Sequence, residues 1–159
     1  MNPAHVIQGP APILSMKELD HREGICSNPI IYKCAKPGIL IADDDVSVRT
    51  LLGDELRSRG FAVWDAADGR RALEVYRAFG PVITVVLLAV NMPETDGPRT
   101  MIELQKINPF VRCIFLTSGD NGKYLMGDLT QLGAEIVFQK PFEAETAADM
   151  LWNMVADDA

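Results

Sequence analysis

Short apolar runs alternate with longer amphipathic segments from residue 38 onward. Each run is rich in aliphatic and β-branched residues and is shorter than a typical helix. The five runs occupy residues 38–42, 61–66, 83–89, 111–117 and 135–139. Strands of this kind separated by helical segments predict an α/β fold, in which parallel strands are joined by crossover helices.

Apolar residues recur at helical spacing in every segment that follows a run. The predicted helical faces contain Val48, Leu51, Leu52 and Leu56; Ala72, Val75, Tyr76 and Phe79; Met101, Leu104 and Ile107; Leu125, Leu129 and Leu132; and Ala147, Met150, Leu151 and Met154. Gly60, Gly80 and Gly133 follow three of these helices, where a positive φ lets the chain turn back. The pattern therefore predicts five strand–helix pairs.

The first 36 residues do not follow this pattern, because prolines interrupt them and their apolar residues fit neither period for long. Ser15 followed by Glu18 has the spacing of a helical capping box. The sequence PIIYKC, residues 29–34, is compatible with a short edge strand. We expect an N-terminal extension over residues 1–36 and one domain over residues 37–159.

Composition and charge narrow the functional classes. A chain of 159 residues that is 48% hydrophobic suits one globular domain, and folding should remove roughly 70% of its surface from water. The net charge is −7, and residues 37–159 hold 11 basic and 19 acidic side chains. This acidity repels phosphate backbones and anionic membranes, so we expect neither nucleic acid nor membrane as a partner.

The cysteines and the apolar stretches indicate a reduced, cytoplasmic setting. Cys26, Cys34 and Cys113 are an odd and scattered set without a CxxC pair. The longest apolar stretch, residues 82–90, is interrupted by Thr84 and is far shorter than the ~20 residues that cross a bilayer. The N-terminus also lacks the basic region of a signal peptide.

Chemically informative residues follow four of the predicted strands. In an open parallel sheet, functional groups gather beyond the carboxyl ends of the strands. These residues are Asp43, Asp44 and Asp45 after the first strand, Ala89 and VNMPETDG at the third, Thr117 and Ser118 at the fourth, and Lys140 and Pro141 after the fifth. Clustered carboxylates favour Mg²⁺, although the triplet alone favours helix capping, by Asp45 in particular.

The joint pattern of ILIADDD, LLAVNMPETDG, FLTSG and QKPF resembles the receiver domain of bacterial two-component response regulators. The resemblance extends over residues 37–155. It implies a flavodoxin-like (βα)5 doubly wound sheet with strand order 2-1-3-4-5. It also implies phosphorelay signal transduction, in which an aspartate at the end of the third strand accepts a phosphoryl group from a partner's phosphohistidine.

The resemblance assigns a metal site and a phosphoacceptor position. Asp43 and Asp44 match the acidic pair that binds Mg²⁺, and Asn91 matches the residue whose backbone carbonyl is a further ligand. Ala89 stands where the phosphoaccepting aspartate belongs, and a methyl group cannot accept a phosphoryl group. We expect no phosphorylation at the usual site, weaker Mg²⁺ binding, and direct pairing of Lys140 with Asp43 or Asp44.

The switch residues are retained in part. Thr117, with Ser118 beside it, matches the hydroxyl that turns toward the phosphoryl group. Lys140 matches the lysine that pairs with the phosphoryl oxygens, and Pro141 matches the proline after it. Val137 stands where the family usually has Tyr or Phe, and the usual coupled rotation is therefore expected to be absent or altered.

These features favour a single-domain pseudo-receiver that works through protein–protein interaction and has no enzymatic turnover. The resemblance implies a sensor histidine kinase or a downstream target as partner. It also implies a homodimer or target surface over the fourth helix, fifth strand and fifth helix, about residues 121–156. Met126, Met150 and Met154 would give that surface an adaptable apolar patch.

Three alternatives remain open at the level of sequence. The first is that the chain is an Asp-to-Ala variant at position 89 of an ordinary phosphoaccepting receiver. The second is that another residue, such as Asp44, accepts the phosphoryl group. The third is that the pocket is a small-anion or nucleotide sensor that uses Lys140 and Thr117. The chain has no GxxxxGK[ST] or GxGxxG loop to support a nucleotide site.

Overall fold

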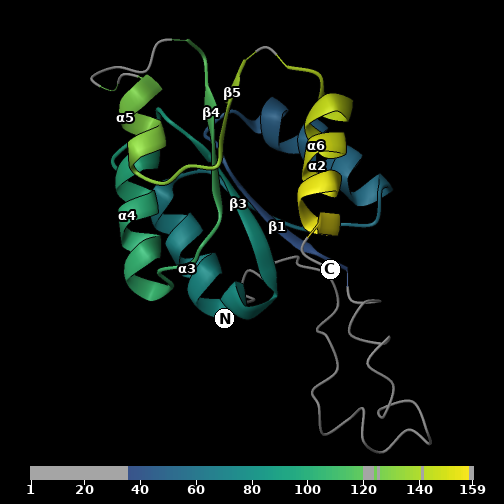
Figure 1. Cartoon of the computed structure of the whole chain (residues 1–159), viewed down its shortest axis with the longest axis horizontal. Coiled ribbons are helices and arrows are strands. Elements are labelled where there is room, and N and C mark those ends of the chain that lie inside the picture. Colours follow the sequence, from purple (N-terminus) through teal and green to yellow (C-terminus); the bar gives the residue numbers. More distant parts are fainter. Residues whose placement is uncertain (1–35, 120–123, 125, 141, 158–159) are drawn as a thin grey trace, which may run out of the picture.

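The computed structural model describes residues 36–119, 124, 126–140 and 142–157. In this part of the chain, strands and helices alternate as the sequence predicts (Figure 1). The elements are β1 (Gly38–Ala42), α2 (Val46–Ser58), β2 (Ala62–Ala66), α3 (Gly69–Phe79), the 3₁₀ turn η2 (Gly80–Val82), β3 (Ile83–Ala89), α4 (Gly97–Ile107), β4 (Cys113–Thr117), α5 (Met126–Gln131), β5 (Ile136–Gln139) and α6 (Ala144–Asp157). The predicted capping box at Ser15, the edge strand at 29–34 and Pro141 lie outside the described residues.

The strands form one parallel sheet in the order β2-β1-β3-β4-β5. The predicted flavodoxin-like fold and its strand order are therefore confirmed. Strand β3 lies in the middle of the sheet and is almost completely buried, which explains its continuous run of aliphatic residues. The carboxyl ends of all five strands point to one edge of the sheet, where the site residues lie.

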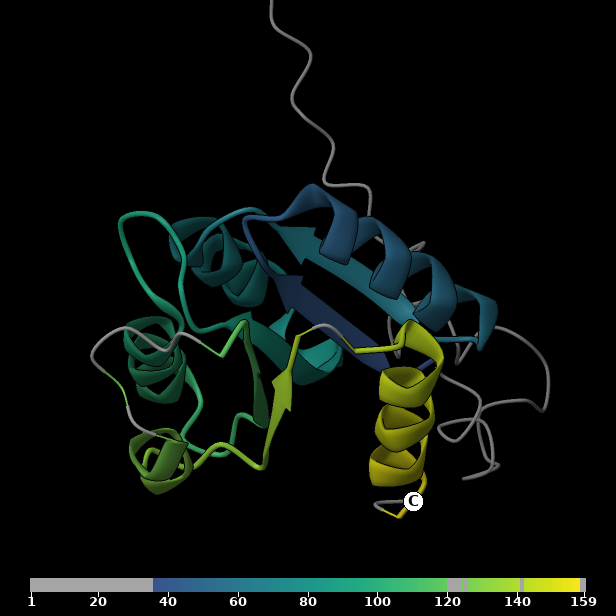
Figure 2. The same cartoon turned by 90° about the horizontal axis from the view of Figure 1, so that it is seen from above.

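Helices cover both faces of the sheet, with α2 and α6 on one face and α3, α4 and α5 on the other (Figure 2). Successive side chains along each strand enter opposite cores, as the two-residue period of a strand requires. In β1, for example, Ile39 and Ile41 join the core beneath α2 and α6, whereas Leu40 and Ala42 join the other core. This arrangement buries the strands on both sides and fixes their register.

Three strands begin one or two residues later than their apolar runs predict. The backbone N–H of Phe61 donates to Leu56 O (3.0 Å) at the end of α2, and that of Val111 donates to Asn108 O (3.1 Å) in a turn. These residues thus close the preceding element before the strand starts. Glu135 is likewise outside β5, although its N–H donates to Cys113 O (3.1 Å).

Two of the three predicted turn glycines adopt a left-handed conformation, and the third does not. Gly60 has φ 93° and Gly133 has φ 101°, as the sequence predicts. The prediction is wrong for Gly80, whose φ is −46°. An added Cβ at Gly80 would lie 3.2 Å from the Tyr76 ring, so the glycine there makes room for the aromatic side chain.

We predict that Gly38→Ala destabilises the fold, because an added Cβ would lie 2.0 Å from Val82 O and 2.9 Å from the Trp64 ring. The expected loss is about 1–3 kcal/mol of unfolding free energy, measured by urea denaturation. Gly127→Ala in α5 is the matched control, because no atom lies within 4 Å of its added Cβ. That change should stabilise the protein by up to about 1 kcal/mol, and equal losses for both variants would contradict the close approach at Gly38.

Candidate functional site

A buried carboxylate occupies the carboxyl edge of the sheet. Asp43 follows β1 directly, and its side chain is completely buried. One carboxylate oxygen, Oδ1, accepts from Asp45 N (2.9 Å), and the other, Oδ2, accepts from Lys140 Nζ (2.5 Å). Both oxygens are therefore engaged, one by the backbone and one by a cation.

Lys140 reaches this carboxylate from the residue after β5, 97 positions later in the chain. Its backbone N–H donates to Thr117 O (2.5 Å), which holds the backbone of Lys140 beside the end of β4. The lysine side chain is 23% exposed, so its charge keeps some contact with water. Of the two partners predicted for Lys140, the structure selects Asp43 rather than Asp44.

Asp44 and Asp45 have different surroundings, although they adjoin Asp43. Asp45 caps α2, since its Oδ1 accepts from Ser47 N (2.8 Å), and the capping role predicted for it is confirmed. Asp44 is exposed. Among the described residues, no three His, Cys, Asp or Glu side chains are grouped so that they could hold a metal ion. The residues present thus fit Mg²⁺ poorly, because Asp43 is already paired with Lys140 and the Asp45 carboxylate is used to cap α2.

Arg49 is a site residue that sequence reasoning missed. Its Nη1 donates to Asp43 O (2.7 Å), and its Nε pairs with Asp65 Oδ2 (3.2 Å). The arginine therefore joins the loop after β1 to strand β2. Its position on the first turn of α2 was the available signal, because helical side chains lean toward the N-terminus of their helix and hence toward that loop.

Ala89 is the last residue of β3 and is 2% exposed. The following loop folds back onto the end of the strand, where Gly97 N donates to Val90 O (2.9 Å). An added Cβ at Gly97 would lie 2.3 Å from Ala89 O, so only glycine permits this approach. Asn91, two residues after Ala89, is exposed. At this edge of the sheet, β3 therefore ends in a methyl group, whereas polar side chains lie at or directly after the ends of β1, β4 and β5.

Thr117, the last residue of β4, and Ser118, which follows it, differ in burial. Thr117 is 2% exposed, and its Oγ1 accepts from Gly119 N (3.1 Å). Ser118 is exposed. In β5, Val137 packs against the core beneath α3, α4 and α5, whereas Phe138 packs against the opposite core. The phenyl ring next to Val137 therefore lies on the other face of the sheet and does not take the place of Val137.

Tyr124 makes a second contact that the sequence did not signal. Its hydroxyl donates to Asp96 Oδ2 (3.0 Å), while Asp96 Oδ1 accepts from Arg99 N (2.9 Å) and caps α4. One carboxylate thus holds both the start of α4 and the residue that lies just before α5. The two partners are 28 residues apart, and no local pattern predicts a tertiary contact of that kind.

Comparison with known proteins places these residues in a family context. A family model described as the response regulator receiver domain matches residues 39–151. The chain is 32% identical over 114 residues to the chemotaxis protein CheY of Bacillus subtilis, an alignment that covers 71% of this chain and 92% of CheY. It is also 38% identical over 79 residues to the sensor kinase CckA of Brucella abortus.

The lengths covered differ between these relatives. The alignment with CckA covers 50% of this chain but 8% of the kinase, so the chain spans a small part of that protein. Among solved structures, the complex of CheX with CheY, BeF₃ and Mg²⁺ from Borrelia burgdorferi contains a similar chain. The TM-score is 0.69 at 27% identity, with 78% of this chain and 93% of that chain covered.

We predict that Lys140→Met lowers the unfolding free energy by about 2–3 kcal/mol, because the buried carboxylate of Asp43 loses its cation. Lys106→Met is the matched control, since Lys106 Nζ makes an exposed ion pair with Glu103 at 2.7 Å. That exposed pair should contribute at most about 0.5 kcal/mol. Similar losses in urea denaturation for the two variants would show that the buried pair has no special role.

Proposed function

The chain belongs to the response regulator receiver domain family, and we propose that it acts in two-component signalling without accepting a phosphoryl group itself. One observation carries this proposal. Ala89 ends β3, where the sequence resemblance assigns the phosphoacceptor, and Asp43, Thr117 and Lys140 lie at the same edge of the sheet. The pocket thus keeps its surroundings and lacks the group that would react.

The chemistry of aspartyl phosphate supports this proposal. The reaction needs a carboxylate oxygen as nucleophile, placed in line with the leaving group and compensated by positive charge. The methyl group of Ala89 has no such oxygen. The Asp43 carboxylate is buried and paired with Lys140, and Asp44 is exposed. Neither acid replaces the missing nucleophile in this arrangement.

Mg²⁺ binding is weak in this proposal. Asp43, Asp44 and the backbone carbonyl of Asn91 are the residues that would hold the ion, which would supply positive charge at the pocket. Mg²⁺ favours several oxygen ligands with carboxylates among them, and Lys140 competes with it for Asp43. The solved CheY complex from Borrelia burgdorferi contains Mg²⁺ together with BeF₃.

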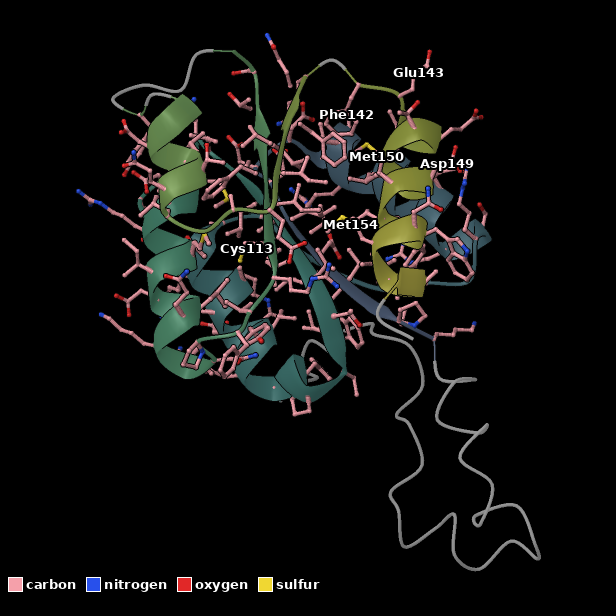
Figure 3. The ribbon with its side chains drawn as sticks, in the orientation of Figure 1. Cys113, Phe142, Glu143, Asp149, Met150 and Met154 are labelled. Carbon is pink, nitrogen blue, oxygen red and sulfur yellow. The ribbon has the colours of Figure 1, made fainter. Side chains whose placement is uncertain are left out.

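In this proposal, the domain signals by binding another protein and does not catalyse a reaction. Receiver domains interact with sensor kinases and downstream targets, and the related CheY from Borrelia burgdorferi was solved in complex with CheX. We assign the interaction to the surface of α5, β5 and α6, which also serves for homodimer formation. Figure 3 shows Met150 and Met154 on α6 and Phe142 in the connection just before it, and all three are half-buried. Flexible methionine side chains suit such an adaptable surface.

A second candidate is that the chain is an Asp-to-Ala variant of an ordinary phosphoaccepting receiver. The retained geometry of Asp43, Thr117 and Lys140 favours it, because these residues would all be needed for phosphoryl transfer. A small-anion sensor is disfavoured, because the groove that Lys140 lines also holds five carboxylate side chains. These would repel an anion that approaches the lysine.

We predict that intact-mass spectrometry detects no phosphoryl mass on this chain after incubation with Mg²⁺ and acetyl phosphate. Ala89→Asp should gain one phosphoryl group, because it restores the nucleophile beside Lys140 and Asp43. Thr117→Ala is a control that removes a hydroxyl and leaves Ala89 in place, and it should stay unmodified.

A phosphoryl mass on the unaltered chain would contradict the proposal. Peptide mapping would then locate the acceptor, with Asp44 as the first residue to test. Failure of Ala89→Asp to gain mass would show instead that the pocket has changed beyond residue 89.

We further predict that Ala89→Asp binds Mg²⁺ at least about tenfold more tightly than the unaltered chain, because it adds a carboxylate ligand and draws Lys140 away from Asp43. Isothermal titration with MgCl₂ measures this difference. Asp43→Asn combined with Ala89→Asp should lose the gain. Equal affinities for the unaltered chain and Ala89→Asp would show that the third carboxylate is not a ligand.

A further inference from the structure

A groove of about 1100 Å³ lies between α2 and the start of α6. Apolar side chains from both sides line it, among them Val48, Leu51 and Leu52 of α2 and Phe142 before α6. Leu51 is 67% exposed, which is unusual for a leucine beside other apolar groups. Figure 3 shows Phe142 and Glu143 just before α6, and both residues line this groove.

The rim of the groove is strongly acidic. The carboxylates that line it are those of Asp45, Asp54, Glu55, Glu143 and Glu145. The one lysine among the lining residues, Lys140, is already paired with Asp43. Arg59 and Arg57 neutralise Glu55 and Asp54 in part, at 2.7 Å and 3.6 Å. A segment that fills this groove should therefore be apolar, cationic and free of carboxylates.

The residues that immediately precede the domain have this composition. The sequence ICSNPIIYKCAK, residues 25–36, contains three isoleucines, one tyrosine and two lysines, and no acidic residue. The stretch before it differs, because residues 15–24 contain Glu18, Asp20 and Glu23. Residues 25–36 thus match the groove in both polarity and charge, and the preceding stretch does not.

The attachment point places these residues within reach. Ala62 N donates to Pro37 O (3.0 Å), so the chain enters β1 beside the residues that follow α2. From there, residues 30–36 span roughly 20 Å when extended. Helix α2, with 13 residues, is also about 20 Å long. An extended segment that returns along α2 therefore reaches Leu51.

We propose that residues 25–36 of the same chain occupy the groove between α2 and α6. Ile30, Ile31 and Tyr32 lie against Leu51 and Phe142, and Lys33 lies among the rim carboxylates. This inference goes beyond the proposed function and needs no phosphoryl chemistry.

The native cysteines allow a direct test on the full chain. Cys26→Ser leaves Cys34 as the cysteine to carry a nitroxide spin label. Cys113 is fully buried, and burial raises the pKa of its thiol to about 12, so it should not react at neutral pH. In two-dimensional NMR, we expect loss of the amide signals of Leu51, Leu52 and Glu145, while those at the end of α4 keep their intensity.

Two variants and one mixing experiment decide the outcome. Leu51→Glu should restore the lost signals, because it adds a carboxylate at the apolar centre of the groove. Ile102→Glu, at an exposed isoleucine of α4, should leave them lost. Uniform signals along α2 in the labelled chain would overturn the proposal. Loss that occurs only when labelled and ¹⁵N-enriched copies are mixed would also overturn it, and would assign the groove to a second copy.

Discussion

The ion pair between Asp43 and Lys140 holds the carboxyl edge of this sheet together. A fully buried carboxylate is costly unless a charge and hydrogen bonds compensate it, and Asp43 has both, from Lys140 Nζ (2.5 Å) and Asp45 N (2.9 Å). The same aspartate receives Arg49 on its backbone carbonyl. Through these contacts β1, α2, β2 and the residue after β5 are joined at one point. The geometry of the pocket depends on this point.

The side chain at position 89 affects the electrostatics of the Asp43–Lys140 ion pair. With a carboxylate at the end of β3, Lys140 would be shared between two acids, and the pocket would carry an additional negative charge for a metal ion to neutralise. With Ala89, the lysine has Asp43 as its acidic partner in the described part of the chain, and the pair can be satisfied without metal. We therefore propose that Ala89 accounts for two properties of the pocket together, the absence of a nucleophile at the end of β3 and a weaker Mg²⁺ site.

The sequence predicted the elements and most of the pocket because local rules determine them. The two-residue and helical periods located the strands and helices, and the strand ends located Asp43, Thr117 and Lys140. The capping role of Asp45 also followed from its place before an apolar helical face. The contacts of Arg49 and Tyr124, the packing role of Gly80 and the groove beside Leu51 were not predicted. Each of these depends on which elements become neighbours in space, which hydrophobic periodicity does not specify.

The most direct test of this account is a titration of the unaltered chain with Mg²⁺ and beryllium fluoride, a stand-in for a bound phosphoryl group, followed by two-dimensional NMR. The account predicts that the amide signals of Thr117 and Lys140 keep their positions, because Ala89 offers no oxygen for beryllium to bind and Lys140 stays with Asp43. The same signals should shift in Ala89→Asp, which shows that the reagent is active. Saturable shifts at Thr117 and Lys140 in the unaltered chain would contradict the central claim.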